Sequence, residues 1–372
     1  MQLFIRVDAS LEIGTGHVMR CLALARQWAA SFLKSEIVFV MREHEGNLCN
    51  LVEQNGFRVV RLPRQSNYRY RVSEAPTFEY DSWLGAEETE DASQTIQVLK
   101  RYVADYVLVD HYAIGGDWQR SVGRFCKRLI TIDDLANREH YCHALIDSTP
   151  GKGISAYENL IPRECVRLIG AAYAMLREEF PRARKESLER RGKKECRHLL
   201  VAMGGVDKDN ITSVVLEALD GGVLPADMEV SVVLGANAPC EDVIRSKIKK
   251  MRAKPRLFVG VSTMAEFMRD ADLAIGAAGS MALERCCMGL PSIQVVVAEN
   301  QIGAADALQK YGAALTAHGP DLVSSIRIQL AELLGNPLKL SAMSQRAAEL
   351  VDGLGTQRII SKITEGMTLP ET

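Results

Sequence analysis

A histidine preceded by two glycines is the first group in the sequence whose type and spacing could support catalysis. After an apolar run that begins the chain, Gly14 and Gly16 lead into His17 and a helical pattern. Glycines let the backbone approach a ligand closely, and the N-terminus of a helix attracts an anion. The same helix start favours a neutral imidazole, which can accept a proton, so His17 is a candidate general base. A helix-capping or core histidine is the alternative that the sequence leaves open.

The same segment does not fit a dinucleotide-binding turn. Met19 stands where the third glycine of that fingerprint belongs, and five residues separate Asp8 from Gly14. The turn is therefore too long, and the sequence disfavours a dinucleotide cofactor.

A second constellation follows a later apolar run that ends in small residues. Gly279 and Ser280 place free backbone N–H groups and a hydroxyl at a helix start, which suits a phosphate without requiring a metal. Glu284 lies one turn beyond Ser280, so its carboxylate can reach a ribose diol. Asn300 and Gln301 begin the next helix. Plain helix capping by Ser280 and Asn300, with Glu284 in a capping-box role, is the alternative.

Polar residues also end two of the apolar runs in the first half. Asp110, His111 and Tyr112 follow one run, and Asp133 follows another. Such strand ends face the ligand cleft in a doubly wound sheet, although an aspartate there can also cap the next segment. Both interpretations stay open for Asp110 and Asp133.

The cysteines and histidines do not form a metal motif. His140, Cys142 and His143 lie close together, but no second pair at ligand spacing accompanies them, so we expect a surface turn there and no metal. The adjacent Cys286 and Cys287 are expected in the core. The nine cysteines are odd in number and scattered, which is typical of buried free thiols in a reducing compartment.

The residues that could do chemistry follow short apolar runs that alternate with helical patterns. This βαβ alternation predicts two parallel sheets with helices on both faces. We therefore expect an α/β fold of two Rossmann-like domains that face a cleft, with ligands at the carboxyl ends of the strands. The expected strands are 2–8, 36–41, 57–62, 104–110, 128–133, 198–205, 228–235, 255–261, 272–276 and 291–297. The expected helices are 17–33, 208–220, 280–288, 300–311, 338–352 and 356–366.

The domain boundaries are expected at a highly charged stretch. We place the N-terminal domain at 1–180, a charged linker with a helical part as an open alternative at 181–197, and the C-terminal domain at 198–372. The terminal helices are candidates for packing back on the first domain. A polar, weakly periodic segment at 63–93 is expected to be a long surface excursion.

Composition limits the classes of function. The chain has 372 residues, of which 47% are apolar and 25% charged, and this is ordinary for a globular protein. Its formal net charge of -2 disfavours nucleic acid or another polyanion as a partner. No run of about 18 apolar residues could span a bilayer, and the N-terminus lacks the pattern of a signal peptide. We expect a cytoplasmic protein without membrane insertion. The sequence leaves the oligomeric state open, although we favour a monomer.

Several of these segments occur in the order of one known family. They are the block from Arg6, Val7 and Asp8 to Arg20, then Asp110-His111-Tyr112, Asp133-Asp134-Leu135-Ala136, Tyr173 through Phe180, Met203 through Asp207 with Asn210, and Gly279-Ser280 through Glu284 to Asn300-Gln301. As a set they resemble the PseG family, the hydrolases of UDP-2,4-diacetamido-2,4,6-trideoxy-β-L-altropyranose in pseudaminic acid biosynthesis. The resemblance covers nearly the whole chain. It implies a GT-B fold similar to that of the MurG-type glycosyltransferases, with the nucleotide in the C-terminal domain.

The resemblance also assigns roles to residues. His17 matches the catalytic histidine of the family's Gly-x-Gly-His motif. The implied substrate-binding residues are Arg6, Asp8, Gly14, Gly16, Asp110, His111, Tyr112 and Arg177. The implied UDP-binding residues are Gly204, Gly205, Gly279, Ser280, Glu284, Asn300 and Gln301. No metal or cofactor is implied.

We therefore expect hydrolysis of a UDP-sugar to UDP and free sugar by water attack at the anomeric carbon, with His17 as the base. The sequence has no carboxylate cluster at metal-ligand spacing, so we expect a metal-independent reaction that breaks a C–O bond and inverts the anomeric centre. Two alternatives stay open. One is an inverting UDP-sugar glycosyltransferase with a sugar acceptor in place of water, and the other is a non-catalytic nucleotide-sugar sensor.

Overall fold

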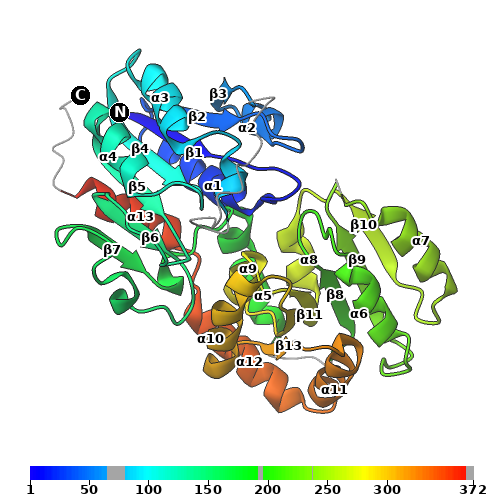
Figure 1. The fold of residues 1–372 in the computed structure, drawn as a ribbon. Coiled ribbons are helices and arrows are strands. Elements are labelled where there is room, and N and C mark those ends of the chain that lie inside the picture. Colours follow the sequence, from blue (N-terminus) through cyan, green and yellow to red (C-terminus); the bar gives the residue numbers. More distant parts are fainter. Residues whose placement is uncertain (65–79, 192–195, 237, 366–372) are drawn as a thin grey trace. The chain divides into compact units, whose positions relative to one another are not determined.

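The chain folds into two compact units, which we describe separately (Figure 1). The structure is a computed structural model and describes residues 1–64, 80–191, 196–236 and 238–365. Unit 1 comprises Met1–Met175 and Gly355–Thr372, and unit 2 comprises Leu176–Leu354. Each unit is an α/β fold built on its own parallel sheet, as the alternation of apolar runs predicts.

Within the described residues, unit 1 has a seven-stranded parallel sheet in the order β3-β2-β1-β4-β5-β6-β7. The strand order reverses between β1 and β4, and ligands bind at the carboxyl edge of such a switch point in open α/β sheets. The strands are β1 (Gln2–Val7), β2 (Glu36–Arg42), β3 (Arg58–Leu62), β4 (Ala104–Asp110), β5 (Cys126–Ile132), β6 (Ala144–Asp147) and β7 (Val166–Ile169). The helices are α1 (Gly16–Ser31), α2 (Cys49–Gln54), α3 (Glu88–Leu99), α4 (Gly116–Val122) and α13 (Gly355–Thr364), with the 3-10 helices η1 (Asp81–Leu84), η2 (Gly123–Phe125), η3 (Ile154–Tyr157) and η4 (Ala171–Tyr173).

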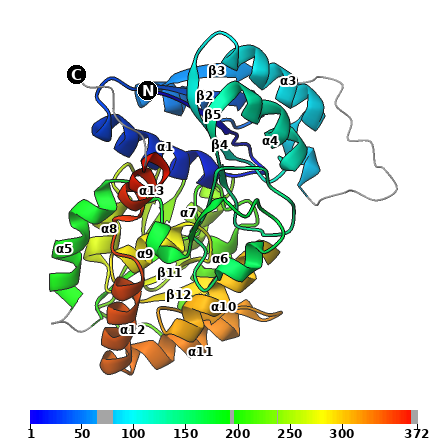
Figure 2. The same cartoon turned by 90° about the vertical axis from the view of Figure 1, so that its left-hand side faces the viewer.

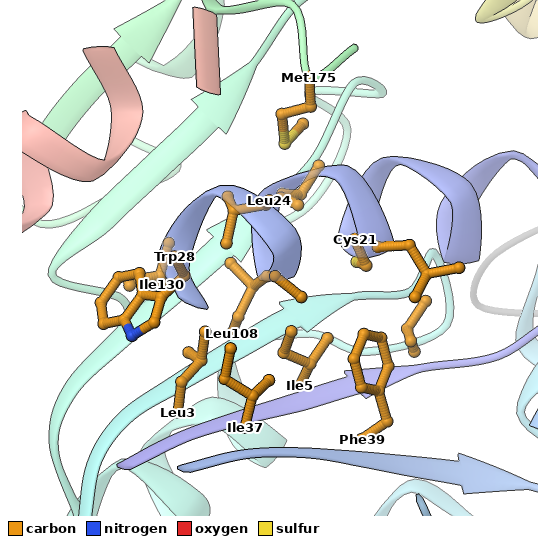
Figure 3. Packing of buried hydrophobic residues seen from close by; sticks show 14 of the residues in the cluster. Leu3, Ile5, Cys21, Leu24, Trp28, Ile37, Phe39, Leu108, Ile130 and Met175 are labelled. Carbon is orange, nitrogen blue, oxygen red and sulfur yellow. The ribbon is translucent and has the colours of Figure 1, made fainter. Parts of the chain in front are cut away.

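Helix α1 covers one face of the unit 1 sheet. Its residues Leu24 and Trp28 are buried in one cluster with Leu3 and Ile5 of β1, and Figure 3 shows these side chains between the helix and the strands. Phe4, which lies between Leu3 and Ile5 in the sequence, belongs to the cluster on the opposite face. This alternation is the period of two that a strand buried on both faces must have.

The C-terminal helix α13 contacts α1 and η4 and therefore packs in unit 1 (Figure 2). Ile359, Ile360 and Ile363 are buried in the same cluster as α1. Gly355 permits this approach, because a Cβ there would lie 2.3 Å from the carbonyl oxygen of Ala174. Of the two terminal helices, α13 joins the first half of the chain, whereas α12 (Pro337–Leu350) is part of unit 2.

A buried carboxylate on α3 holds two arginines of the sheet. Asp91 accepts from Nε and Nη2 of Arg6 at 3.0 and 2.6 Å, from Nη2 of Arg42 at 2.6 Å and from Nε1 of Trp118 at 3.0 Å. Burial by itself raises the pKa of the Asp91 carboxyl, but the two guanidinium groups outweigh it and lower this pKa. Ion pairs therefore fix α3 to β1 and β2 in addition to apolar packing.

Within the described residues, unit 2 has a six-stranded parallel sheet in the order β10-β9-β8-β11-β12-β13. The switch point of this sheet lies between β8 and β11. The strands are β8 (His198–Ala202), β9 (Glu229–Leu234), β10 (Arg256–Val259), β11 (Leu273–Ala277), β12 (Ser292–Val295) and β13 (Leu315–Ala317). The helices besides α12 are α5 (Glu179–Arg191), α6 (Ile211–Leu219), α7 (Glu241–Lys250), α8 (Met264–Asp270), α9 (Met281–Cys287), α10 (Ile302–Tyr311) and α11 (Leu322–Leu334), with the 3-10 helix η5 (Glu299–Gln301).

The charged stretch that we expected to be a linker is largely helix α5, which is packed within unit 2. Arg191 donates to the carbonyl oxygens of Met268, Ala271 and Met288 at 2.5, 2.6 and 2.8 Å. Arg184 donates in the same way to carbonyl oxygens of α12 and of the segment after it. These arginines bind the orphan carbonyls of helix ends, an attachment that an apolar pattern does not reveal.

Other differences from the expected elements have equally local causes. The strands β6, β7 and β13, which have three or four residues each, were not expected. Of the expected surface excursion at 63–93, residues 65–79 lie outside the described residues, whereas η1 and the start of α3 are ordered around the buried Asp91. No helix of the described residues is long and apolar enough to cross a membrane.

We predict that replacing Asp91 by leucine destabilises unit 1 by about 3–5 kcal/mol, because Arg6 and Arg42 would keep buried charges without a carboxylate. All three tryptophans of the chain, Trp28, Trp83 and Trp118, lie in unit 1, so denaturant unfolding followed by tryptophan fluorescence reports on this unit. The control is Asp117→Ala, which removes an exposed carboxylate 2.7 Å from Arg120. Its effect should stay below about 1 kcal/mol. Equal effects of the two substitutions would contradict the role of Asp91.

Candidate functional site

His17 lies in the first turn of α1, beside the end of β4 at the switch point of unit 1. Its Nδ1 is 2.7 Å from Oδ1 of Asp110, which is fully buried, while His17 itself is 8% exposed. A lone pair on Nδ1 would face the carboxylate, so Nδ1 carries the hydrogen and donates it to Asp110. Nε2 then holds the free lone pair, and no described residue forms a hydrogen bond with it. This arrangement can accept a proton at Nε2.

Arg20, one turn further along α1, binds the same carboxylate. Its Nε donates to Oδ2 of Asp110 and its Nη2 to Oδ1, both at 2.6 Å, while its Nη1 donates to Asp134 at 2.9 Å. Burial by itself raises the pKa of the Asp110 carboxyl, but Arg20 and His17 outweigh it, so this pKa lies well below its usual range. Asp110 is therefore ionised at neutral pH, and it orients His17 rather than capping the next segment.

Aromatic rings lie next to the imidazole of His17. The ring of Tyr112 meets it edge to face with the centroids 4.6 Å apart, and the centroid of Trp83 in η1 is 6.4 Å away. Tyr80 and Trp83 in turn lie 5.0 and 5.6 Å from the centroid of Tyr112. Tyr112 is buried, whereas Tyr80 and Trp83 are half-buried. The rings give the site an apolar surface beside its polar groups.

The expected glycines form the loop that leads to His17. Gly14 has a φ of 77°, which other residues rarely adopt, and no described atom lies within 4 Å of the place where its Cβ would be. Gly16 is the first residue of α1. Ligand binding at these two glycines stays a prediction.

Three of the residues expected to bind substrate are buried inside unit 1, and substrate binding by them stays a prediction. Arg6, Asp8 and His111 are 1%, 0% and 3% exposed. Asp8 pairs with Nη1 of Arg6 at 2.7 Å, and Nε2 of His111 and of His44 lie 3.4 and 3.6 Å from its Oδ2. Burial lowers the pKa of the His111 imidazole. Because these polar groups are turned toward one another, they hold the carboxyl ends of β1, β2 and β4 together.

In unit 2 the expected nucleotide residues follow three neighbouring strands, β8, β11 and β12, at their carboxyl ends. Oε1 of Glu284 accepts from Nε and Nη2 of Arg177 at 3.3 and 3.2 Å. Oε2 is buried and has no partner within the described residues. Burial raises the pKa of the Glu284 carboxyl although Arg177 opposes this. Arg177, expected among substrate-binding residues of the first domain, thus pairs with a nucleotide candidate in unit 2.

The capping alternatives for Ser280 and Asn300 are wrong. Ser280 is exposed at the start of α9, and its side chain makes no capping hydrogen bond. Asn300 lies inside η5, and the residue before α10 is Gln301. The side-chain Nε2 of Gln301 is 3.5 Å from the place where a Cβ on Gly279 would be, so the loops after β11 and β12 meet there.

The loop after β8 is held against the loop after β9. Gly204 has a φ of 108°, and the carbonyl oxygen of Gly205 would lie 1.8 Å from a Cβ on Gly235. Only glycine at position 235 permits this approach of two backbones. Gly204 and Gly205 therefore stay at the carboxyl edge, and their contact with a nucleotide stays a prediction.

The histidine and cysteine cluster that we considered for a metal has separate partners. Nδ1 of His140 is 3.0 Å from the amide nitrogen of Gln119, Cys142 is 3.6 Å from Cys165, and His143 accepts the N–H of Leu129 at 3.0 Å. The expected surface turn is wrong for His140 and Cys142, which are buried. No group of three or more His, Cys, Asp or Glu side chains in the described residues could hold a metal ion. Cys286 and Cys287 are buried and free, as expected.

Two members of the His17 site, Arg20 and Asp134, were not among the expected site residues. Arg20 is three residues beyond His17 and lies on the same face of α1, so helical spacing could have indicated it. Asp134 follows the end of β5, two strands away from β1 in the sheet. Its position just after an expected strand was the only feature of the sequence that could have indicated Asp134 as a site residue.

Comparison with known proteins supports the resemblance found in the sequence. Residues 198–359 match the glycosyltransferase family 28 C-terminal domain. The chain is 24% identical over 313 residues to the UDP-2,4-diacetamido-2,4,6-trideoxy-beta-L-altropyranose hydrolase of Campylobacter jejuni, with 84% of this chain and 97% of that protein covered. It is 28% identical over 306 residues to the uncharacterized protein MJ1062 of Methanocaldococcus jannaschii. That match covers 81% of this chain and 56% of the relative, so the chain spans about half of its length.

The solved structure of Acinetobacter baumannii MurG is similar in fold. The TM-score is 0.66 at 15% identity, and the match covers 98% of this chain and 99% of that chain. With the two parallel sheets described above, this likeness confirms the expected GT-B-like architecture.

We predict that unit 1 loses stability as the pH falls below about 4, because several buried carboxyls have folded-state pKa values below their ordinary value of about 3.9. These carboxyls are Asp8, Asp91, Asp110 and Asp133. The sign follows from proton binding: below pH 4 the unfolded chain takes up protons that the folded unit does not. Tryptophan fluorescence unfolding between pH 5 and pH 3 measures the slope. Asp110→Asn should give a smaller slope than the wild type, and an unchanged slope would show that Asp110 does not contribute.

Proposed function

We propose that the protein hydrolyses UDP-2,4-diacetamido-2,4,6-trideoxy-β-L-altropyranose to UDP and the free sugar, a step of pseudaminic acid biosynthesis. The similarity to the Campylobacter jejuni hydrolase over 84% of the chain supports the choice of substrate. The contact of 2.7 Å between Nδ1 of His17 and Asp110 is the observation that carries the proposal, because it leaves Nε2 ready to accept a proton. We place the reaction in the cytoplasm and treat the protein as a monomer.

The proposed proton acceptor is Nε2 of His17 in unit 1. As water attacks the anomeric carbon, Nε2 takes its proton, and the ionised Asp110 stabilises the imidazolium through Nδ1–H. Removal of a general base typically reduces the rate by about 10²–10⁴. The half-buried rings of Tyr80 and Trp83 offer apolar surface for the methyl and acetamido groups of such a sugar.

The proposed leaving group is UDP, held by unit 2. The backbone N–H groups at Gly279 and Ser280 suit the diphosphate, which takes the electron pair of the broken C–O bond. The unpartnered Oε2 of Glu284 suits a ribose hydroxyl. A diphosphate leaves without strong protonation, so this route needs neither a second acid nor a metal.

An inverting UDP-sugar glycosyltransferase is the second candidate. The match of residues 198–359 to a glycosyltransferase domain favours it. The two reactions differ only in the nucleophile, which is water in one and a sugar hydroxyl in the other. Release of UDP from the UDP-sugar without any acceptor distinguishes them, and binding without release would indicate a sensor.

We predict that His17→Gln reduces kcat by at least about 10² and leaves UDP affinity within a few fold, because the base and the nucleotide residues belong to different units. Coupled detection of UDP and calorimetric titration with UDP measure the two effects. The matched control is His143→Gln, an exposed histidine before β6, and it should keep wild-type turnover. A His17 variant with near wild-type kcat would make His17 a structural residue.

We predict that Glu284→Ala and Ser280→Ala each weaken UDP binding by about 1–3 kcal/mol, through loss of a hydrogen bond to the nucleotide. Calorimetry measures the affinity, and Glu332→Ala on α11 removes an exposed, ion-paired carboxylate as a control. The melting temperature should change less than the affinity. If both variants bind UDP like the wild type, the nucleotide lies elsewhere.

We predict that hydrolysis in ¹⁸O-labelled water with excess chelator puts the label in the sugar, with the anomeric configuration inverted, since a single displacement without a nucleophilic carboxylate inverts the centre. Mass spectrometry locates the label, and proton NMR at early times gives the anomer. Label in the phosphate of UDP, or activity that disappears with chelator and returns with a divalent ion, would contradict attack on carbon by a His17-activated water.

A further inference from the structure

All three nitrogens of the Arg20 guanidinium donate to groups around His17. Nε and Nη2 each bind one oxygen of Asp110, Nη1 binds Asp134, and Nη2 also lies 3.1 Å from Nδ1 of His17. A planar guanidinium that binds a carboxylate through two nitrogens fixes its orientation as well as its position. Arg20 therefore sets the direction in which Oδ1 of Asp110 meets the imidazole.

The formal charges of Arg20, Asp110, Asp134 and His17 sum to zero only when the imidazole is protonated. Arg20 carries one positive charge, and Asp110 and Asp134 carry one negative charge each, so their sum is -1. Beside a neutral imidazole the cluster is anionic, and beside an imidazolium it is neutral. Such a cluster stabilises the charge that appears on His17 when it takes a proton.

The remaining neighbours of His17 do not change this sum. Burial raises the pKa of the Tyr112 hydroxyl and of the Cys21 thiol well above their usual values, so both stay neutral. Trp83, the second aromatic ring beside His17, carries no charge. Arg20 is thus the cation that contacts both Asp110 and His17, while Lys152 donates to the backbone carbonyl oxygen of Asp134 at 2.6 Å.

We propose that Arg20 is a positioning residue, which holds Asp110 against Nδ1 of His17 and offsets the charge of one of the two neighbouring carboxylates. The inference rests on the proposed function, because it takes His17 as the base. In the step itself, the proton of water passes to Nε2, the water oxygen bonds to the anomeric carbon, and the bond from that carbon to the phosphate oxygen breaks. UDP keeps the electron pair, and Arg20, Asp110 and Asp134 remain ionised.

Two substitutions with opposite effects on the charge test this role. Arg20→Met leaves two carboxylates beside His17, so the acidic limb of the pH profile of kcat/KM should move to higher pH by about one unit, and activity should recover as the pH is raised. Asp134→Asn leaves Arg20 and Asp110 in balance, so the same limb should move to lower pH. A general structural defect would not move the acidic limb of the pH profile in opposite directions in the two variants.

Arg20→Lys separates charge from geometry. Lysine keeps the positive charge but cannot form the bidentate hydrogen bonds to Asp110. We therefore expect kcat to fall about tenfold while the acidic limb of the pH profile stays close to that of the wild type. Arg26→Met is the matched control, because Arg26 is exposed on α1 and its recorded partner is the neutral Asn55. It should leave the rate and the pH profile unchanged.

A measurement without substrate separates this inference from the proposed function. In protein labelled with ¹⁵N-histidine, the His17 signals, assigned by their loss in His17→Gln, should show hydrogen on Nδ1 at pH 8 and should respond to acid at higher pH in Arg20→Met than in the wild type. If the wild type releases no UDP from the UDP-sugar, the proposed function fails, and the NMR result still decides the role of Arg20.

The role of Arg20 is overturned by either of two results. One is an Arg20→Met variant whose pH profile and His17 signals match the wild type. The other is a uniform loss of activity at every pH, with unchanged His17 signals, in Arg20→Met and Arg20→Lys alike. Should Arg20→Met not fold, the direction of the shift in Asp134→Asn and the profile of Arg20→Lys decide the question.

Discussion

The parallel pairing of β1 with β4 is the constraint on which the site of unit 1 depends. The register sets Val7 opposite Asp110, so the loop after β1 and the end of β4 meet at one edge of the sheet. Helix α1 begins from that loop and packs its apolar side on the same strands, which brings His17 to a carboxylate 93 positions away in the sequence. If the register between β1 and β4 shifted by one residue, the side chains of β1 would point to the opposite faces of the sheet. His17 and Asp110 would then no longer meet.

Several charged side chains of unit 1 are buried, and they pair with counter-charges, either on another element or within one loop. Asp91 of α3 pairs with arginines of β1 and β2, and Asp133 after β5 pairs with Arg138 at 2.9 Å. A buried ion pair that loses one partner is strongly destabilising, so these contacts hold the loops at the carboxyl edge in one arrangement. The His17 site lies among them, and its geometry is therefore as rigid as the ion pairs that surround it.

The carboxyl edge of the sheet in unit 2 carries other chemical groups than that of unit 1. There the candidate ligand groups are largely backbone N–H groups and small residues after β8 and β11, and close approaches of the chain keep them in place, as at Gly205 and Gly235. Arginines attach α5 to the same unit by binding carbonyl oxygens. The two units share an architecture, but one presents ionised side chains and the other presents backbone donors, which suit proton transfer and phosphate binding respectively.

The sequence by itself determined the two parallel sheets, since short apolar runs that alternate with helical patterns predict buried strands. It also placed His17, Ser280 and Glu284 just after strand ends. It did not reveal the short strands, the packing of α5, or the burial of Arg6, Asp8 and His111. The packing of α5 and the burial of these three residues depend on carbonyl acceptors and on charged partners from other segments, and such pairs leave no local period. The assembly of Arg20, Asp110 and Asp134 around His17 was likewise decided only by the tertiary structure, because it requires α1, β4 and the end of β5 to meet at one edge.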